Sequence, residues 1–193
     1  IFYQGEELSR LLLQAVGPSS LPEGVDRVDD DGGLKAFVER LSASLRRALP
    51  GEDFELESIE LRWTHQDNPR GDRPHVDGVY LTARLALKGP GTVVYEITRG
   101  ALTVRPSPAG AMVVITNSDR EMLTKVPGTV HSAPAGRFAD RVILLVRYRS
   151  RRLGLLDSFS DAALTKRVER REDWVIEQLK KRAKTPAPED LSA

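Results

Sequence analysis

The sequence predicts a mainly β protein, a sandwich or barrel of short strands with helices at both ends of the chain. Short β-rich runs recur between residues 54 and 149, and Gly/Pro turns separate them. These runs do not alternate with helices, which argues against a parallel α/β sheet. Both ends of the chain carry apolar residues at helical spacing. A length of 193 residues suits a single domain over residues 1–193.

The N-terminal part, residues 1–50, is predicted to be helical. Apolar residues at helical spacing predict a first helix over residues 8–15, which ends before Gly17-Pro18. A second amphipathic stripe predicts a helix from Leu34 to Leu49, which Pro50-Gly51 ends.

Strand patterns occupy residues 54–150, which we expect to form the β core of the domain. A weak two-residue alternation begins at Phe54. Clearer β-rich runs follow between turn residues, at Val79–Leu87, Thr92–Ile97, Leu102–Arg105, Ala111–Thr116, Met122–Val126 and Arg141–Arg149.

The C-terminal part is predicted to be one long helix over residues 160–184, followed by a mobile tail over residues 185–193. Its apolar face comprises Leu164, Val168, Val175 and Leu179, and charges of both signs cover the rest. We expect this face to pack on the sheet or on a second copy of the chain, which makes a homodimer through the helix a further prediction.

Composition excludes several classes of function. The 29 basic and 28 acidic residues leave a net charge of +1, so we expect neither a nucleic-acid partner nor an anionic membrane surface. The chain has no cysteine, which removes disulfides, thiolate zinc sites and cysteine nucleophiles. The first residues lack a basic and apolar leader pattern, so we expect no signal peptide and a cytoplasmic location.

The chemistry that remains is concentrated at histidine. The chain has three histidines, and His75-Val76-Asp77 directly precedes a predicted strand. Residues two apart on an extended segment point to the same side, so His75 and Asp77 offer two ligands to one metal ion. His131 is the third candidate ligand. Two histidines and one carboxylate leave open coordination positions, an arrangement that favours non-haem Fe(II) and oxygen chemistry.

These residues resemble the signature of the Fe(II)/2-oxoglutarate-dependent dioxygenases, and the prolyl-4-hydroxylase-like branch is the most similar. The pattern is His75-x-Asp77, a distant His131, and Arg141 ten residues later. The resemblance implies a double-stranded β-helix, a jelly roll with helices packed outside. It also implies Fe(II) on the two histidines and the aspartate, with O2 and 2-oxoglutarate as co-substrates. Arg141 would bind the distal carboxylate of 2-oxoglutarate.

Other residues are expected near that site. Tyr80, Tyr95 and Thr129 are candidates for a hydroxyl that shares the carboxylate with Arg141, and the sequence does not choose among them. Arg84, Trp63 and Arg73 are candidate substrate-binding residues. A second copy of the motif, His65-Gln66-Asp67, lies in a loop-like segment, and we expect it not to bind the metal.

The resemblance implies hydroxylation of an unactivated C–H bond. The substrate is expected to be small and polar: an amino acid, a peptidyl side chain or a natural product. Two alternatives remain open at this point. One is a cupin-like metal enzyme that does not use 2-oxoglutarate, and the other is a non-catalytic β-sandwich that binds a ligand.

Overall fold

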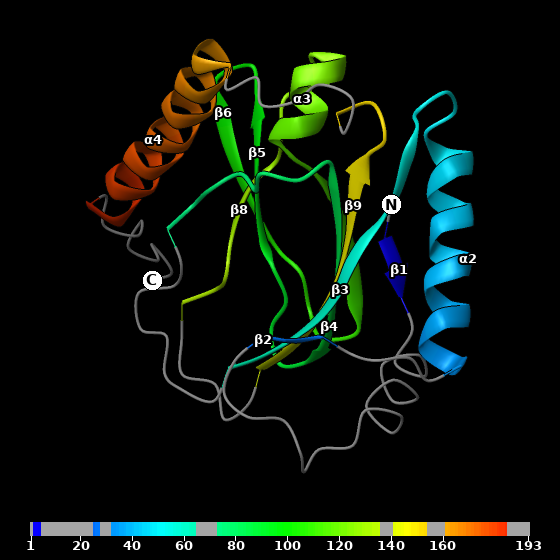
Figure 1. Cartoon of the computed structure of the whole chain (residues 1–193). Helices are drawn as coiled ribbons and strands as arrows, with labels where there is room; N and C mark the ends of the chain where they lie inside the picture. The colour runs from blue at the N-terminus through cyan, green and yellow to red at the C-terminus, as the bar shows by residue number, and fades with distance from the viewer. Residues whose placement is uncertain are drawn as a thin grey trace.

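Two antiparallel sheets face each other at the centre of the molecule (Figure 1). The structure is a computed structural model, and it describes residues 2–4, 25–27, 32–64, 73–135, 141–153 and 161–184. The six-stranded sheet has the order β1-β7-β4-β9-β3-β2, and the three-stranded sheet has the order β6-β5-β8. In chain order, the strands are β1 (Phe2–Gln4), β2 (Val25–Arg27), β3 (Phe54–Thr64), β4 (Leu81–Lys88), β5 (Val93–Thr98), β6 (Ala101–Pro106), β7 (Ala111–Thr116), β8 (Val130–Ser132) and β9 (Arg141–Ser150).

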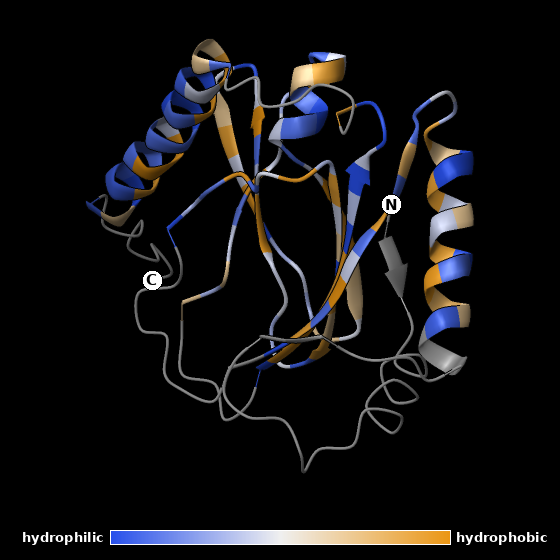
Figure 2. Ribbon diagram, viewed as in Figure 1, coloured by the Kyte–Doolittle hydropathy of each residue, from blue (hydrophilic) through white to orange (hydrophobic). Residues whose placement is uncertain are grey.

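Helices cover the outer faces of both sheets. Helix α2 (Gly32–Ala48) lies against the large sheet, and α4 (Ala162–Lys184) lies against the small one (Figure 1). The short helix α3 (Ser118–Thr124) follows β7. Figure 2 shows that the exposed sides of α2 and α4 are hydrophilic. No helix within the described ranges is both long and apolar enough to cross a membrane.

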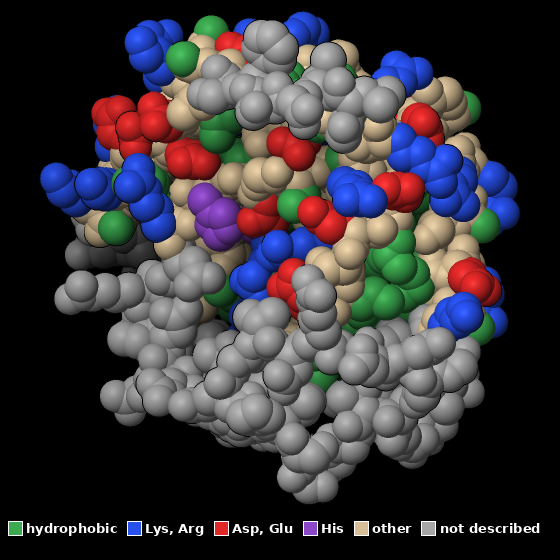
Figure 3. Space-filling model, viewed as in Figure 1, with side chains coloured by type: hydrophobic (Ala, Val, Ile, Leu, Met, Phe, Trp, Pro, Cys, Tyr) green, Lys and Arg blue, Asp and Glu red, His purple; other side chains and the backbone are tan. Residues whose placement is uncertain are grey.

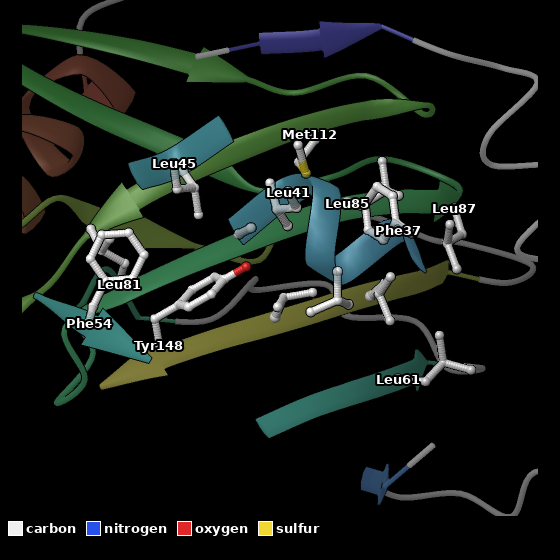
Figure 4. Close-up of a cluster of buried hydrophobic side chains, with 14 of the residues drawn as sticks. Phe37, Leu41, Leu45, Phe54, Leu61, Leu81, Leu85, Leu87, Met112 and Tyr148 are labelled. Atoms are coloured by element: carbon white, nitrogen blue, oxygen red, sulfur yellow. The ribbon is translucent and has the colours of Figure 1, made fainter. Parts of the chain in front are cut away.

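The main core lies between α2 and the outer face of the large sheet (Figure 4). Leu41 and Leu45 of α2 pack there against Leu85 of β4 and Tyr148 of β9. Because side chains alternate along a strand, the residues between these core positions face the other sheet. The inner face carries Arg84 on β4 and Arg141 on β9. Because the apolar core side chains of these strands are buried on the outer face, the two arginines point towards the space between the sheets.

Most predicted elements have counterparts in the structure. The second helix appears as α2, the C-terminal helix as α4, and the run at Ala111–Thr116 as β7 with the same bounds. The apolar face of α4 is used within the chain, because Val175 and Leu179 pack against the small sheet. The predicted helix over residues 8–15 and the tail over residues 185–193 lie outside the described residues.

The predicted strand at Met122–Val126 is wrong, because most of this segment belongs to α3. Asn117 occupies the N-cap position, and Asp119 and Glu121 lie in the first turn, where acidic side chains stabilise a helix. These start signals precede the apolar pair Met122-Leu123 that suggested a strand. Two strands also come from the part predicted to be helical, since β1 and β2 extend the large sheet at both edges.

A buried ion pair anchors α3. Arg120 donates to the carboxylate of Glu52 from Nε at 2.9 Å and from Nη2 at 2.5 Å, and the Tyr80 hydroxyl donates to the same carboxylate at 2.8 Å. The hydrogen bonds from Arg120, with help from Tyr80, outweigh burial and hold the pKa of Glu52 below its usual value of 4.5.

Glu52→Gln is expected to lower the free energy of unfolding by about 3 kcal/mol at pH 7, because it leaves the buried Arg120 without a counter-charge. Since the pKa of Glu52 is lower in the folded state, its contribution is complete above the unfolded pKa and is lost as the pH falls through the folded one. Urea unfolding at several pH values measures this difference. The exposed Glu39→Gln on α2 is the control, and an equal loss in both variants at pH 7 would contradict the prediction.

Candidate metal centre

Three potential ligands converge at the edge of the small sheet. One ligand atom from each of His75, Asp77 and His131 lies within 4.8 Å of the others. His131 belongs to β8, and His75 forms a two-residue bridge with it. The amide of each histidine donates to the carbonyl oxygen of the other at 2.9 Å. The segment before β4 therefore adds to the small sheet as a further edge, and this pairing sets the two imidazoles side by side, with ring centroids 4.6 Å apart.

Both imidazoles are oriented by backbone carbonyl groups. Nδ1 of His75 lies 2.8 Å from the carbonyl oxygen of Arg73, and Nδ1 of His131 lies 3.0 Å from that of Thr129. With Nδ1 as the donor, Nε2 of each ring carries a free lone pair. The two Nε2 atoms lie 3.5 and 3.4 Å from the oxygens of Asp77. This is the orientation that metal-binding histidines require.

A further observation indicates that these three residues suit a metal ion. His131 is fully buried, and its Nε2 has no hydrogen-bond partner among the described residues. A buried nitrogen without a partner is costly unless a ligand occupies its lone pair. A divalent cation at this position would satisfy His131 together with His75, whose side chain is partly exposed. Figure 3 shows histidine (purple) at the surface beside carboxylate and Lys/Arg side chains.

The electrostatics favour the metal-binding protonation state at Asp77 and His131, but not at His75. Burial opposes ionisation of Asp77, but the two imidazoles and Arg84 outweigh it and hold the pKa of Asp77 well below its usual range. Burial, the largest influence on His131, lowers its pKa, so this ring is neutral at neutral pH. Hydrogen bonding to Asp77 raises the pKa of His75 and favours its protonated form, so a metal ion that binds there must displace a proton. An ionised carboxylate and a neutral imidazole are the forms that bind metals.

Two helices hold the motif segment in place. Glu172 of α4 accepts a hydrogen bond from the amide of Val76 at 2.8 Å, and Asp173 pairs with Arg73 at 2.8 Å. At the start of α3, the amide and hydroxyl of Ser118 both donate to the carbonyl oxygen of Asp77 at 3.1 Å. The backbone of the motif is therefore fixed from both sides, independently of any ion.

Gly128 packs directly beneath the motif. A Cβ at this position would lie 2.7 Å from Cγ1 of Val76 and 3.1 Å from the backbone carbon of Asn117. Gly128→Ala is therefore expected to displace the His75–Asp77 segment and to weaken Mn(II) binding about tenfold, as loss of an outer support does in metal proteins. Calorimetric titration measures this affinity. The matched control is Gly78→Ala, because a Cβ there meets nothing within 4 Å. Equal affinities in the two variants would show that the contact with Val76 does not position the site.

Arg141 lies on the inner face at the start of β9. Its side chain is buried, with Nε donating to the carbonyl oxygen of Pro90 at 2.9 Å and Nη2 donating to that of Gly91 at 3.2 Å. Arg141 also lies close enough to Arg84 to lower the pKa of that residue. The structure thus places Arg141 on the face that Arg84 shares, with part of its guanidinium holding the turn before β5.

The three hydroxyl candidates make other contacts in the structure. Tyr80 is a core residue that donates to Glu52 and stacks on Phe54. Tyr95 packs in the cluster under α4, where its hydroxyl lies 2.9 Å from Ser132 Oγ. The hydroxyl of Thr129 contacts that of Thr116 at 3.1 Å, and its carbonyl group orients His131. These contacts correct Tyr80 and Tyr95 to structural residues, whereas the role of Thr129 at the co-substrate stays a prediction.

The predicted substrate residues are placed unequally. Arg84 is buried on the inner face near Asp77, as a pocket residue would be. The exposed Arg73 pairs with Asp173, and only its carbonyl group contacts the site. Trp63 lies in β3 opposite Val142, and its side chain is outside the described part of the chain. His65-Gln66-Asp67 also lies outside the described residues.

Three further charged residues, not predicted as site residues from the sequence, lie on the inner face: Glu60, Arg62 and Arg147. Arg147 and Arg62 approach the two carboxylate oxygens of Glu60 at 3.3 and 3.6 Å. Once the strand register is known, all three fall on the same face of the large sheet as Arg84 and Arg141. Alternation along single strands was the available signal, but it does not reveal which residues meet across strands.

Comparison with known proteins shows similarity in structure alone. No family sequence model matches the chain, and no curated protein matches it in sequence. A viral collagen prolyl hydroxylase from Paramecium Bursaria Chlorella virus-1 has a TM-score of 0.54 at 12% identity, over 78% of this chain and 89% of that one.

Two further prolyl hydroxylases are also similar in structure. A prolyl 4-hydroxylase from Phytophthora capsici has a TM-score of 0.59 at 13% identity, over 79% of this chain and 59% of that one. A prolyl hydroxylase from Trichoplax adhaerens, solved with a peptide fragment of hypoxia inducible factor, has a TM-score of 0.56 at 14% identity, over 82% and 87%. These similarities confirm the double-stranded β-helix fold.

Proposed function

We propose that the chain is an Fe(II)- and 2-oxoglutarate-dependent oxygenase that hydroxylates an unactivated C–H bond of a small polar or peptidyl substrate. The observation that carries this proposal is the convergence of His75, Asp77 and His131, with the buried Nε2 of His131 left without a partner in the described chain. The fold shared with prolyl hydroxylases supports it.

The roles of the residues follow from their positions. His75 and His131 would hold the iron through Nε2, and Asp77 would hold it through its carboxylate. Three ligands on one face leave positions for 2-oxoglutarate and dioxygen. Bound iron supplies the oxidising chemistry, in which 2-oxoglutarate becomes succinate and CO2 while the substrate gains a hydroxyl group. Arg141 would bind the distal carboxylate of 2-oxoglutarate through its guanidinium.

The substrate class is the finer part of the proposal. A peptidyl side chain is one member of this class, since one of the similar prolyl hydroxylases was solved with a peptide fragment. Amino acids and natural products stay in the same class of small polar substrates. A cytoplasmic location and a homodimer stay predictions of the sequence. Because Val175 of α4 is fully buried in the chain's own core, a dimer would have to use other residues of that helix.

The direct test measures metal uptake and co-substrate turnover separately. Protein purified without chelator is titrated with Fe(II) under nitrogen and then exposed to oxygen with 2-oxoglutarate. We expect one metal ion per chain and formation of succinate. Metal uptake without binding of 2-oxoglutarate or N-oxalylglycine would instead favour the cupin-like alternative. The absence of metal uptake would favour a non-catalytic binding module.

A further inference from the structure

Arg84 is the buried charge for which the proposed chemistry gives no role. It lies in the middle of β4 on the inner face of the large sheet, and only 8% of its surface is exposed. No described residue accepts a hydrogen bond from its Nε or Nη1. A buried guanidinium without acceptors is costly to the folded state, so such a residue is expected to have a ligand.

The charges around Arg84 do not compensate it. Burial, followed by the repulsion of Arg62, Arg141 and Arg147, lowers its pKa to about 10 against the attraction of Asp77. Glu60 is already shared between Arg147 and Arg62. If Asp77 binds a cation, its negative charge serves that cation, and a further positive charge lies near Arg84. Loading the metal centre therefore increases the need for an anion beside this arginine.

There is space for a ligand between the two sheets. A cavity of about 260 Å³ is lined by Val113 and Ile115 of β7, and by Val94 and Thr129 on the other side. Val113 lies directly opposite Arg84 in the β4–β7 ladder, and Val94 lies opposite His131 in the β5–β8 ladder. The cavity thus adjoins the neighbours of both residues. Its valine and isoleucine side suits an apolar group, and Glu96, Arg105 and Ser107 make another part of the lining polar.

We propose that Arg84 anchors a binding site for a carboxylate of the primary substrate, next to the metal centre and facing the inter-sheet cavity. The substrate class is then a small carboxylic acid with an apolar body, such as an amino acid. This proposal rests on the proposed function only in taking the neighbouring group of His75, Asp77 and His131 to be an iron site.

The co-substrate is the other source of a carboxylate, and the register argues against it. Arg84 lies opposite Leu145 on β9, four residues along that strand from Arg141. Four residues of a strand span roughly 13 Å of backbone, so the Cα atoms of the two arginines lie at different levels of the large sheet, although Arg141 is close enough to lower the pKa of Arg84. With the distal carboxylate of 2-oxoglutarate at Arg141, Arg84 is left for a second ligand.

The first experiment separates the two sources of carboxylate. Mn(II)-loaded protein saturated with N-oxalylglycine is titrated calorimetrically with propionate in a constant chloride background. We expect propionate to bind, and Arg84→Gln to weaken its binding at least about tenfold while the affinity for N-oxalylglycine stays unchanged. The control is Arg149→Gln, an exposed arginine of β9 that pairs with Glu55. Propionate binding that does not depend on Arg84 would overturn the proposal. Loss of N-oxalylglycine affinity in Arg84→Gln would overturn the assignment to the substrate.

The second experiment does not depend on the metal. Metal-free protein is titrated with propionate, and we expect weaker binding that still depends on Arg84, because Asp77 now compensates part of its charge. This arm still tests Arg84 if Mn(II) does not bind and the proposed function fails.

Thermal unfolding of Arg84→Met gives an independent readout. A buried arginine whose partner is a ligand is expected to destabilise the ligand-free protein, so replacing Arg84 by methionine is expected to raise Tm by about 2–4 °C. A clear fall in Tm would indicate a structural role and contradict the proposal.

Discussion

Asp77→Ala is expected to abolish tight divalent metal binding without unfolding the protein. Asp77 supplies the only carboxylate of the three-residue cluster, and both imidazoles point Nε2 at it. We expect the affinity for Mn(II) to fall more than about a hundredfold, beyond the loss typical of an outer-shell partner. Succinate formation from 2-oxoglutarate should fall with it. The fold should persist because Ser118 binds the backbone carbonyl of Asp77, which alanine retains.

The matched control for this variant is Glu177→Gln. Glu177 is also a carboxylate, but it is exposed on α4 and pairs with Lys181 of the same helix. We expect metal affinity to change little in this variant, and circular dichroism should show the same fold in both. If Asp77→Ala bound Mn(II) as tightly as the unmodified chain, the ion would occupy another site. Asp67→Ala would then decide whether the His65-Gln66-Asp67 copy supplies it.

Arg141→Met is expected to weaken N-oxalylglycine binding about a hundredfold and to leave metal affinity unchanged. A carboxylate that loses a buried guanidinium loses two charge-assisted hydrogen bonds, each worth about 1.5–3 kcal/mol. Arg141 lies on β9 and is not among the grouped ligands, which is why metal binding should not respond. Calorimetry on Mn(II)-loaded protein measures both affinities.

Arg141→Lys separates the charge from the shape of the side chain. Lysine keeps the positive charge but cannot reproduce a planar fork, so an intermediate loss of about tenfold is expected. Both variants also lose donors to the carbonyl groups of Pro90 and Gly91, so thermal unfolding must accompany the titrations. Unchanged N-oxalylglycine binding in Arg141→Met, at full metal occupancy, would remove Arg141 from the co-substrate site.

The long elements of this fold could be predicted from sequence because their patterns are local. Helix α2 carries a stripe of apolar residues, and β7 is an apolar run between turns, so each element can be recognised from its own residues. Helix α3 was mistaken for a strand because seven residues carry too little periodicity to outweigh one apolar pair. Strand β8 is three residues long, and its identity depends on pairing with β5 and His75.

The metal cluster could be predicted because His75 and Asp77 share one extended segment and the chain has few histidines. The surrounding residues could not, because their direction depends on register. Tyr80 precedes the first residue of β4, and both Tyr80 and Leu81 enter the same outer core, so alternation does not extend across that boundary. Tyr95 lies beside Val94, and only the pairing of Val94 with His131 shows which of the two faces the centre.

The reciprocal amide–carbonyl pair between His75 and His131 joins two parts of the chain that lie far apart in sequence. Closing the rim of the small sheet and assembling the ligand set are thereby one folding event. The pair holds both imidazoles in position without a metal ion, so a divalent cation that bound there would cost the chain little conformational entropy. Conversely, a substitution that breaks these two backbone hydrogen bonds would prevent metal binding even though every ligand residue is still present.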